Sequence, residues 1–179
     1  MRRSLKLSYY RGEHFGAICL PMSGGAGMWL ILPDEDSSLQ SLIDGGEAAA
    51  LLAETRNWAD QEEYLVHLAL PKFDVDFDLS LIDALQTMGV TDVFDPQRSD
   101  FSPLTDDKLL VSQVQHAARV RIDEEGCEAA AFTVIDVRAA EAPSQEPEEL
   151  DFVCDRPFLF AVTGQGGTLF VGAVSDPTQ

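Results

Sequence analysis

The sequence predicts an α+β fold, in which strands and helices are segregated along the chain instead of alternating regularly. Two pairs of apolar runs, each pair separated by a glycine-rich turn, are typical of β-hairpins. Between them, apolar residues recur at every second position in several segments and at helical spacing in others. Because the chain has 179 residues and is 45% hydrophobic, one domain with a sizeable core is expected.

The first hairpin is predicted over residues 15–33, FGAICLPMSGGAGMWLILP. Its SGGAG turn has neither the Walker nor the Rossmann spacing, so a phosphate-binding loop is not expected. Two short surface helices should follow between Leu39 and about Glu63, separated by Gly45 and Gly46. Their apolar faces hold Leu39, Leu42 and Ile43, and then Leu51, Leu52, Thr55 and Trp58.

Two strands are predicted on either side of Pro71, because apolar residues alternate before it and again after it. These residues are Val66, Leu68 and Leu70, and then Phe73, Val75 and Phe77. Asp78 should cap the following helix, and Gly89 should end it. The apolar stripe of that helix is Leu79, Ile82, Leu85 and Met88.

A long, half-buried strand is expected over residues 109–123, LLVSQVQHAARVRID. One face would carry Val114, His116, Ala118, Val120 and Ile122. The last part of the chain, PFLFAV, GQGG and TLFVGAV, predicts a second hairpin of buried character. In total, about six to eight strands and about three helices are expected.

The charge excludes several classes of partner. With 31 acidic and 12 basic residues, the formal net charge is −19, so nucleic acid would be repelled. A membrane surface is not an expected partner either, because the only basic cluster, Arg2, Arg3 and Lys6, is small. No apolar run is long enough to cross a bilayer, and the start lacks the apolar stretch of a signal peptide, so the chain is expected to be soluble.

The three cysteines, Cys19, Cys127 and Cys154, are an odd number at wide spacing and form no C-x-x-C pair. This spacing argues against a disulfide framework and against a zinc site, so free thiols are expected. No cofactor or metal is predicted. Nothing in the sequence places a nucleophile, a base and an orienting group together, so an enzyme is not expected.

The segment between the long strand and the last hairpin is DEEGCEAAAFTVIDVRAAEAPSQEPEELDF. Its second half, with Pro143, Ser144 and Pro147, predicts an exposed loop. In its first half every second residue from Cys127 to Val137 is small or apolar, and all the charges lie at the positions between. A segment attached to an exposed loop is therefore patterned as a strand with one buried face. Periodicity alone favours the simpler interpretation, that this is one more ordinary strand.

DEEGCEAAAFT resembles the hinge motif of the serpin family. Further similar segments occur in serpin order and spacing, namely ALPKF, GVTDVF, DFSPL, VSQVQHAA, DRPFLFAV and TLFVGAVSDP. The resemblance covers essentially the whole chain, residues 1–179, and implies the C-terminal half of the serpin fold, with strands of its large and small sheets and a few surface helices. Residues 124–152 would form the hinge and the exposed reactive-centre loop.

The resemblance implies an inhibitor of serine-type endopeptidases that acts as a suicide substrate. A protease attacks the bait loop and forms an acyl-enzyme ester, and the cleaved loop then inserts as a new strand of the large sheet. Family members mostly act outside the cell, so an extracellular location is implied. Because only half of the fold is recognised, the chain should need an N-terminal serpin half or associate with itself. The alternatives are a non-inhibitory serpin-like binding module and a truncated, inactive serpin.

Insertion requires small side chains on the inward face of the hinge, and Cys127, Ala129, Ala131 and Thr133 meet this requirement. Glycine at position 126 fits a pivot of the backbone. The hinge as a whole comprises Glu124, Glu125, Gly126, Cys127, Glu128, Ala129, Ala130, Ala131, Phe132 and Thr133. By resemblance, Glu124 would form an ion pair with Lys72 that holds the strand opening shut.

The family's usual loop length, counted from Gly126, places the bait residue at Ala140 and the scissile bond before Glu141. A small apolar bait suggests an elastase-like or subtilisin-like protease. The loop is longer than usual before DRPF, so cleavage between Arg138 and Ala139, which would suggest a trypsin-like protease, remains an alternative.

His116 invites a catalytic interpretation together with Ser112 and Asp123 of the same predicted strand. Residues four apart on a strand are too distant for direct proton transfer, so a structural role is expected for His116. His14 and His67 have no partner that the sequence identifies.

Overall fold

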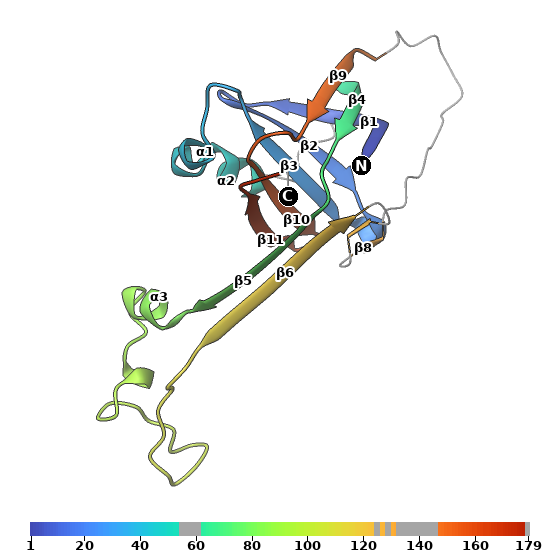
Figure 1. Ribbon diagram of the computed structural model, residues 1–179. Helices are drawn as coiled ribbons and strands as arrows, with labels where there is room; N and C mark the ends of the chain where they lie inside the picture. The colour runs from blue at the N-terminus through green and yellow to red at the C-terminus, as the bar shows by residue number, and fades with distance from the viewer. Residues whose placement is uncertain (54–61, 124–125, 128–129, 132–146, 178–179) are drawn as a thin grey trace. The chain divides into compact units, whose positions relative to one another are not determined.

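A computed structural model of the chain describes residues 1–53, 62–123, 126–127, 130–131 and 147–177, without the side chains of residues 126–127 and 130–131. The described residues divide into two compact units. The first comprises Met1–Val75 and Val120–Gln179, and the second comprises Asp76–Arg119. Strands and helices are segregated, which confirms the α+β prediction (Figure 1).

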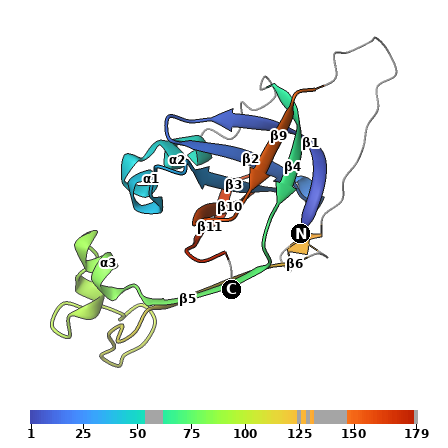
Figure 2. The same ribbon diagram turned by 45° about the horizontal axis from the view of Figure 1, so that its top comes forward.

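A seven-stranded sheet dominates the first unit, in the order β11-β10-β3-β2-β1-β4-β9. Neighbouring strands are antiparallel except β4 and β9, which are parallel. Figures 1 and 2 show β9 beside β4. The strands are β1 (Arg2–Arg11), β2 (Phe15–Pro21), β3 (Gly27–Pro33), β4 (Glu63–Ala69), β9 (Glu149–Val153), β10 (Phe158–Gly164) and β11 (Gly167–Val174).

Both predicted hairpins are confirmed. β2 and β3 pair from Phe15 opposite Pro33 to Pro21 opposite Gly27, and β10 pairs with β11 in the same way. The turn between β2 and β3 needs glycine, because Gly24 and Gly25 have φ angles of 74° and 76°. The second hairpin is less buried than the sequence suggested, since β11 is the edge strand and exposes Leu169 and Val171 at 62% each.

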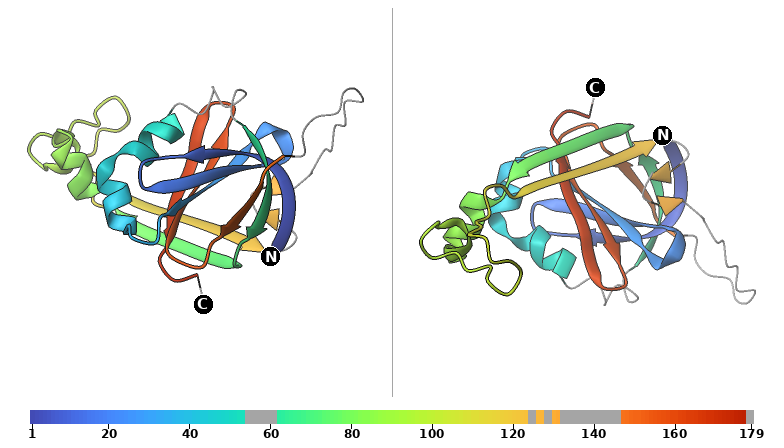
Figure 3. Two further views of the ribbon diagram at one scale, coloured as in Figure 1. Left: turned by 90° about the horizontal axis from the view of Figure 1, so that it is seen from above. Right: turned by 90° about the horizontal axis from the view of Figure 1, so that it is seen from below.

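One face of the sheet is covered by the two predicted short helices, α1 (Leu39–Gly45) and α2 (Glu47–Ala53) (Figure 3). Ser38 caps α1 by accepting a hydrogen bond from the backbone N–H of Ser41, and Gly46 ends it with a φ of 73°. The core on this side contains Phe15, Ala17, Trp29, Ile31, Leu42, Ala48, Leu51, Leu159 and Ala161.

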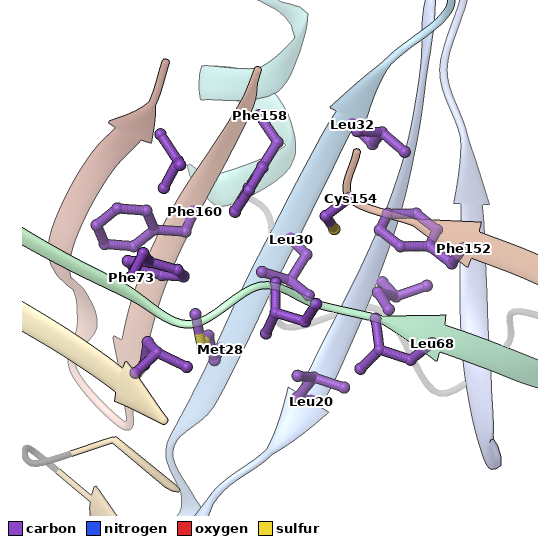
Figure 4. Packing of buried hydrophobic residues seen from close by; sticks show 14 of the residues in the cluster. Leu20, Met28, Leu30, Leu32, Leu68, Phe73, Phe152, Cys154, Phe158 and Phe160 are labelled. Atoms are coloured by element: carbon purple, nitrogen blue, oxygen red, sulfur yellow. The ribbon is translucent and has the colours of Figure 1, made fainter. Parts of the chain in front are cut away.

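The opposite face carries the larger core (Figure 4). Phe73 packs against Phe158 and Phe160 with ring centroids 5.8 and 5.0 Å away. Further members come from β2, β3, β4, β9, β10 and the end of β6, among them Leu20, Met28, Leu30, Val66, Leu68, Phe152, Val120 and Ile122. The alternating side chains of the central strands therefore serve two cores, one on each face.

The second unit contains α3 (Ile82–Thr87) and parts of two strands, β5 (Phe73–Ser80) and β6 (Gln115–Asp123), within which the unit boundary falls. The predicted helix cap is wrong, because Asp78 lies inside β5 and Leu81 is the residue that precedes α3. Gly89 follows the helix with a φ of 93°, as a stop signal should.

The long predicted strand is shorter than expected, because β6 begins only at Gln115. Two further strands were not predicted. β1 occupies the polar-looking start of the chain, and β9 includes residues 149–152, which the sequence assigned to the exposed loop.

Candidate functional site

The segment after β6 folds back beside the end of that strand. β7 (Gly126–Cys127) is antiparallel to β6, with Gly126 opposite Asp123 and Cys127 opposite Ile122. β8 (Ala130–Ala131) in turn pairs with β7. The described backbone of the predicted hinge, residues 126–127 and 130–131, therefore lies in a sheet, in the order β5-β6-β7-β8.

The end of β6 is firmly packed. Val120 and Ile122 belong to the larger core, and Ile122 is only 2% exposed. On the other face of β6, a guanidinium nitrogen of Arg121 lies 3.7 Å from a carboxylate oxygen of Asp123. In the described part of the chain, β7 pairs with β6 only at Ile122 and Asp123. Among the described residues, no other pairing is made on that side of β6, and a strand continuing from the hinge could bond there antiparallel.

The far end of the predicted loop leads into β9, which is attached differently. The backbone N–H of Leu65 donates to the carbonyl of Glu148 at 2.9 Å, and that of Cys154 donates to the carbonyl of Ala69 at 2.8 Å. Phe152 points into the larger core and is 3% exposed. Burial raises the pKa of the Cys154 thiol to about 12. Cys154 is a free cysteine, and so is Cys19, whose pKa burial also raises to about 12.

Many predicted site residues lie outside the described residues. They are the two candidate reactive bonds, Ala140 with Glu141 and Arg138 with Ala139, and the hinge residues Glu124, Glu125, Glu128, Ala129, Phe132 and Thr133. Lys72 is exposed and immediately precedes β5. Its ion pair with Glu124 therefore stays a prediction.

His116 is exposed on β6, whereas Ser112 lies before the strand begins. The prediction that these two residues share one strand is therefore wrong. The structural role of His116 stays a prediction. Among the residues that the structure describes, no group of His, Cys, Asp and Glu side chains could hold a metal ion, and no helix is long and apolar enough to span a membrane.

Sequence reasoning missed the partners of His67. Its Nδ1 lies 2.9 Å from Ser4 Oγ, and its Nε2 lies 3.3 Å from Glu149 Oε2. The three residues come from β1, β4 and β9 and are 63 and 82 positions apart, so no local pattern could reveal them. If β1 and β9 had been recognised as strands, the alternation of side chains could have placed the three residues on one face of the sheet. This strand parity was the only available signal.

Comparison with known proteins places this geometry in a family. Residues 1–177 match the family model described as "Serpin (serine protease inhibitor)". A putative serpin-Z6C from Oryza sativa subsp. japonica is 37% identical over 163 residues, which is 85% of this chain and 39% of the rice protein. Plasminogen activator inhibitor 1 from Sus scrofa is 33% identical over 175 residues, or 93% of this chain and 40% of that protein.

Solved structures of serpins are also similar to this chain. A serpin from the trematode Schistosoma haematobium has a TM-score of 0.75 at 27% identity, covering 97% of this chain and 45% of that one. A serpin from the insect Tenebrio molitor has a TM-score of 0.74 at 25% identity, covering 100% of this chain and 45% of that one. The chain spans about two fifths of the length of the curated relatives it matches. The family resemblance seen in the sequence is thus confirmed over residues 1–177, and the chain belongs to the serpin family.

Proposed function

We propose that the chain forms the C-terminal part of a serine protease inhibitor that acts by loop insertion. The observation that carries this proposal is the antiparallel pairing of Gly126 and Cys127 with the end of β6. A loop that continued in this direction would add a strand along β6. The family relationship and the small residues at alternate hinge positions support the same mechanism.

In the proposed reaction, the serine hydroxyl of the protease attacks the carbonyl carbon of Ala140. The peptide bond to Glu141 breaks, the new amine of Glu141 takes up a proton, and an ester joins Ala140 to the protease. Insertion of residues 126–140 beside β6 would then carry the protease away before water hydrolyses the ester. The protein is a substrate that traps its protease, and the chain is not itself an enzyme.

The proposed partner protease is elastase-like or subtilisin-like if Ala140 is the bait, and trypsin-like if Arg138 is. The extracellular location, which the family resemblance implies, is part of the proposal. Neither nucleic acid nor a membrane is proposed as a partner, in keeping with the net charge of −19.

A second partner is the N-terminal part of a serpin fold, or failing that another copy of this chain. The edge strand β11 supports this proposal, because Leu169 and Val171 are each 62% exposed there and Phe170 is 36% exposed. An apolar strand with a free edge favours pairing with another strand. Two relatives are long enough to contain such an N-terminal part, because this chain covers 39% and 40% of their lengths.

The deciding experiment mixes the chain, alone and co-expressed with an N-terminal serpin half, with elastase, subtilisin and trypsin. A covalent complex that survives denaturing electrophoresis is expected, and mass spectrometry of the released peptide should identify the bond between Ala140 and Glu141. Arg138→Ala should leave the elastase complex intact, and should abolish complex formation only if Arg138 is the bait. Cleavage without any complex in either form would contradict inhibition and favour a non-inhibitory or truncated serpin.

Ala131→Arg is the matched control for insertion. It leaves the bait sequence unchanged but places a long, charged side chain at an inward position of the hinge, where burial of an unpaired charge is costly. The protease should still cleave this variant at the same bond, whereas the covalent complex should be lost. Equal amounts of complex from the variant and the wild-type chain would rule out insertion of this segment.

The proposed Lys72–Glu124 ion pair has its own test. An exposed pair of this kind contributes about 1 kcal/mol or less, so its proposed role is to delay strand opening and not to stabilise the fold. Lys72→Ala should therefore accelerate spontaneous loss of inhibitory activity. If the variant keeps both its stability and its rate of activity loss, the pair has no such role.

A further inference from the structure

Three side chains from three neighbouring strands form one chain of hydrogen bonds on the outer face of the seven-stranded sheet, which is the face opposite the larger core. Ser4 of β1 lies opposite His67 of β4 in the strand register, with Oγ and Nδ1 2.9 Å apart. The other imidazole nitrogen, Nε2, lies 3.3 Å from Oε2 of Glu149 on β9. The bonds therefore connect an interior strand, β1, to an edge strand, β9, through the strand between them.

Among the residues that the structure describes, β9 has one neighbour in the sheet, β4, and it is five residues long. Its inner face packs Phe152 and Leu150 against the larger core. Its outer face carries Glu149, Asp151 and Val153, all exposed. Glu149 is the first residue of the strand, so its bond to His67 lies at the end of β9 that faces the predicted bait loop.

Each of the three groups can supply the donor or the acceptor that its hydrogen bond requires. In the neutral imidazole, Nε2–H donates to the carboxylate and Nδ1 accepts from the hydroxyl of Ser4. In the protonated imidazole, both nitrogens donate, and the hydroxyl oxygen of Ser4 accepts instead. Strand parity places charges of both signs on the same face, Arg2 and Lys6 on β1, Glu63 on β4 and Asp151 on β9.

We infer that His67 is a positioning residue that holds β9 against the sheet through Glu149 while Ser4 orients its imidazole. In consequence, the C-terminal end of the proposed bait loop is fixed to the seven-stranded sheet. An uncleaved loop stays joined to β9, whereas cleavage would separate the hinge segment from β9. Only this consequence rests on the proposed function, since the attachment of β9 is a property of the sheet itself.

Amide hydrogen exchange of the full chain, followed by mass spectrometry, tests the inference without measuring inhibition. His67→Leu removes both bonds but keeps a side chain of similar bulk. Residues 149–153 should then exchange about 3- to 10-fold faster, as expected for the loss of two partly exposed hydrogen bonds. Exchange in β10 and β11 should not change. His67→Gln should restore much of the protection, because its amide can accept from Ser4 and donate to Glu149.

Two further variants separate the link from general loosening of the sheet. Ser4→Ala removes only the orienting bond and should give a smaller increase of exchange in β9, and Asp151→Ala, on the same outer face of β9, should give none. If β9 exchanges within about twofold of wild type in His67→Leu, or if His67→Gln behaves like His67→Leu, the inference is overturned. A chain that fails to inhibit proteases would leave this result unaffected.

Discussion

The two ends of the proposed bait loop are held in different ways. At the hinge end, the described parts of β7 and β8 are two residues long, and within the described residues β7 bonds to β6 at two positions, Ile122 and Asp123. At the other end, β9 pairs with β4 over five positions, buries Phe152 and is linked to His67 on its outer face. A loop anchored in this way can change its pairing at the hinge while its C-terminal end stays in place, which is the asymmetry that loop insertion requires.

Both strands that flank the loop nevertheless pack into the same core. Ile122 at the end of β6 and Phe152 in β9 are members of one cluster on the larger face of the sheet. We call these two residues the anchors. The two ends of the loop therefore differ in the short segments next to the anchors and not in the anchors themselves. Substitutions at the anchors should affect stability strongly, and substitutions beyond them weakly.

The largest effect is expected for Phe152→Ala. The ring is 3% exposed, and its removal from a packed core should lower the free energy of unfolding by about 3–5 kcal/mol. Urea unfolding followed by circular dichroism measures the loss. Val153→Ala is the control, because Val153 is 40% exposed on the other face, and it should cost less than about 1 kcal/mol. Equal losses for both variants would show that β9 is not anchored through its inner face.

Ile122→Ala tests the anchor on the hinge side. Ile122 is 2% exposed, and the expected loss is about 2–5 kcal/mol by the same measurement. If the loss were below about 1 kcal/mol, the end of β6 would be as loosely held as β7, and the comparison between the two ends would fail.

Much of the fold could be predicted from the sequence because its signals are local. The β2–β3 hairpin, the helices α1 and α2 and the strands on either side of Pro71 follow from periodicity and from glycine and proline positions. β1 was missed although Leu5, Leu7 and Tyr9 alternate, because its outer face carries Arg, Ser and Lys and suggested only a polar start. β9 was missed because it is short and acidic, and only Leu150 and Phe152 mark its buried face.

The remaining features depend on contacts between distant segments. The parallel pairing of β4 with β9, and with it the partners of His67, follows from the order of strands in the sheet, which one sequence does not encode locally. The predicted cap at Asp78 failed for a similar reason, because pairing with β6 keeps β5 extended through Ser80. The hinge pattern differs from these features because the alternation of small residues is local, and its role in insertion stays a prediction.

The pH dependence of stability tests the burial of Cys154, which directly follows β9. Burial raises the pKa of this thiol to about 12, against about 8.5 for a free cysteine. The unfolded thiol therefore loses its proton first as the pH rises, so the folded state is favoured fully below pH 8.5 and progressively less above it. The stability advantage of wild type over Cys154→Ala should shrink by about 1 kcal/mol for each pH unit between about 9 and about 10.5. An unchanged difference would mean that the thiol is not buried.

The smallest effect is expected at Arg156, which fastens the segment after β9 to the end of β3. Its Nε donates to the carbonyl of Pro33 at 2.9 Å, and its ion pair with Asp155 at 3.0 Å is exposed. Arg156→Ala should cost about 1 kcal/mol through loss of the backbone bond. Asp155→Ala should cost less than about 0.5 kcal/mol, and the opposite order would assign the effect to the ion pair.

The most direct test of the account compares both ends of the loop before and after cleavage. The chain, co-expressed with an N-terminal serpin half, would be cleaved in the loop and its amide hydrogen exchange measured at residues 115–121 of β6 and 149–153 of β9. Exchange should slow in β6, because the cleaved hinge bonds along it, while exchange in β9 should stay the same. Unchanged exchange in β6, or loss of protection in β9, would contradict insertion from the hinge end.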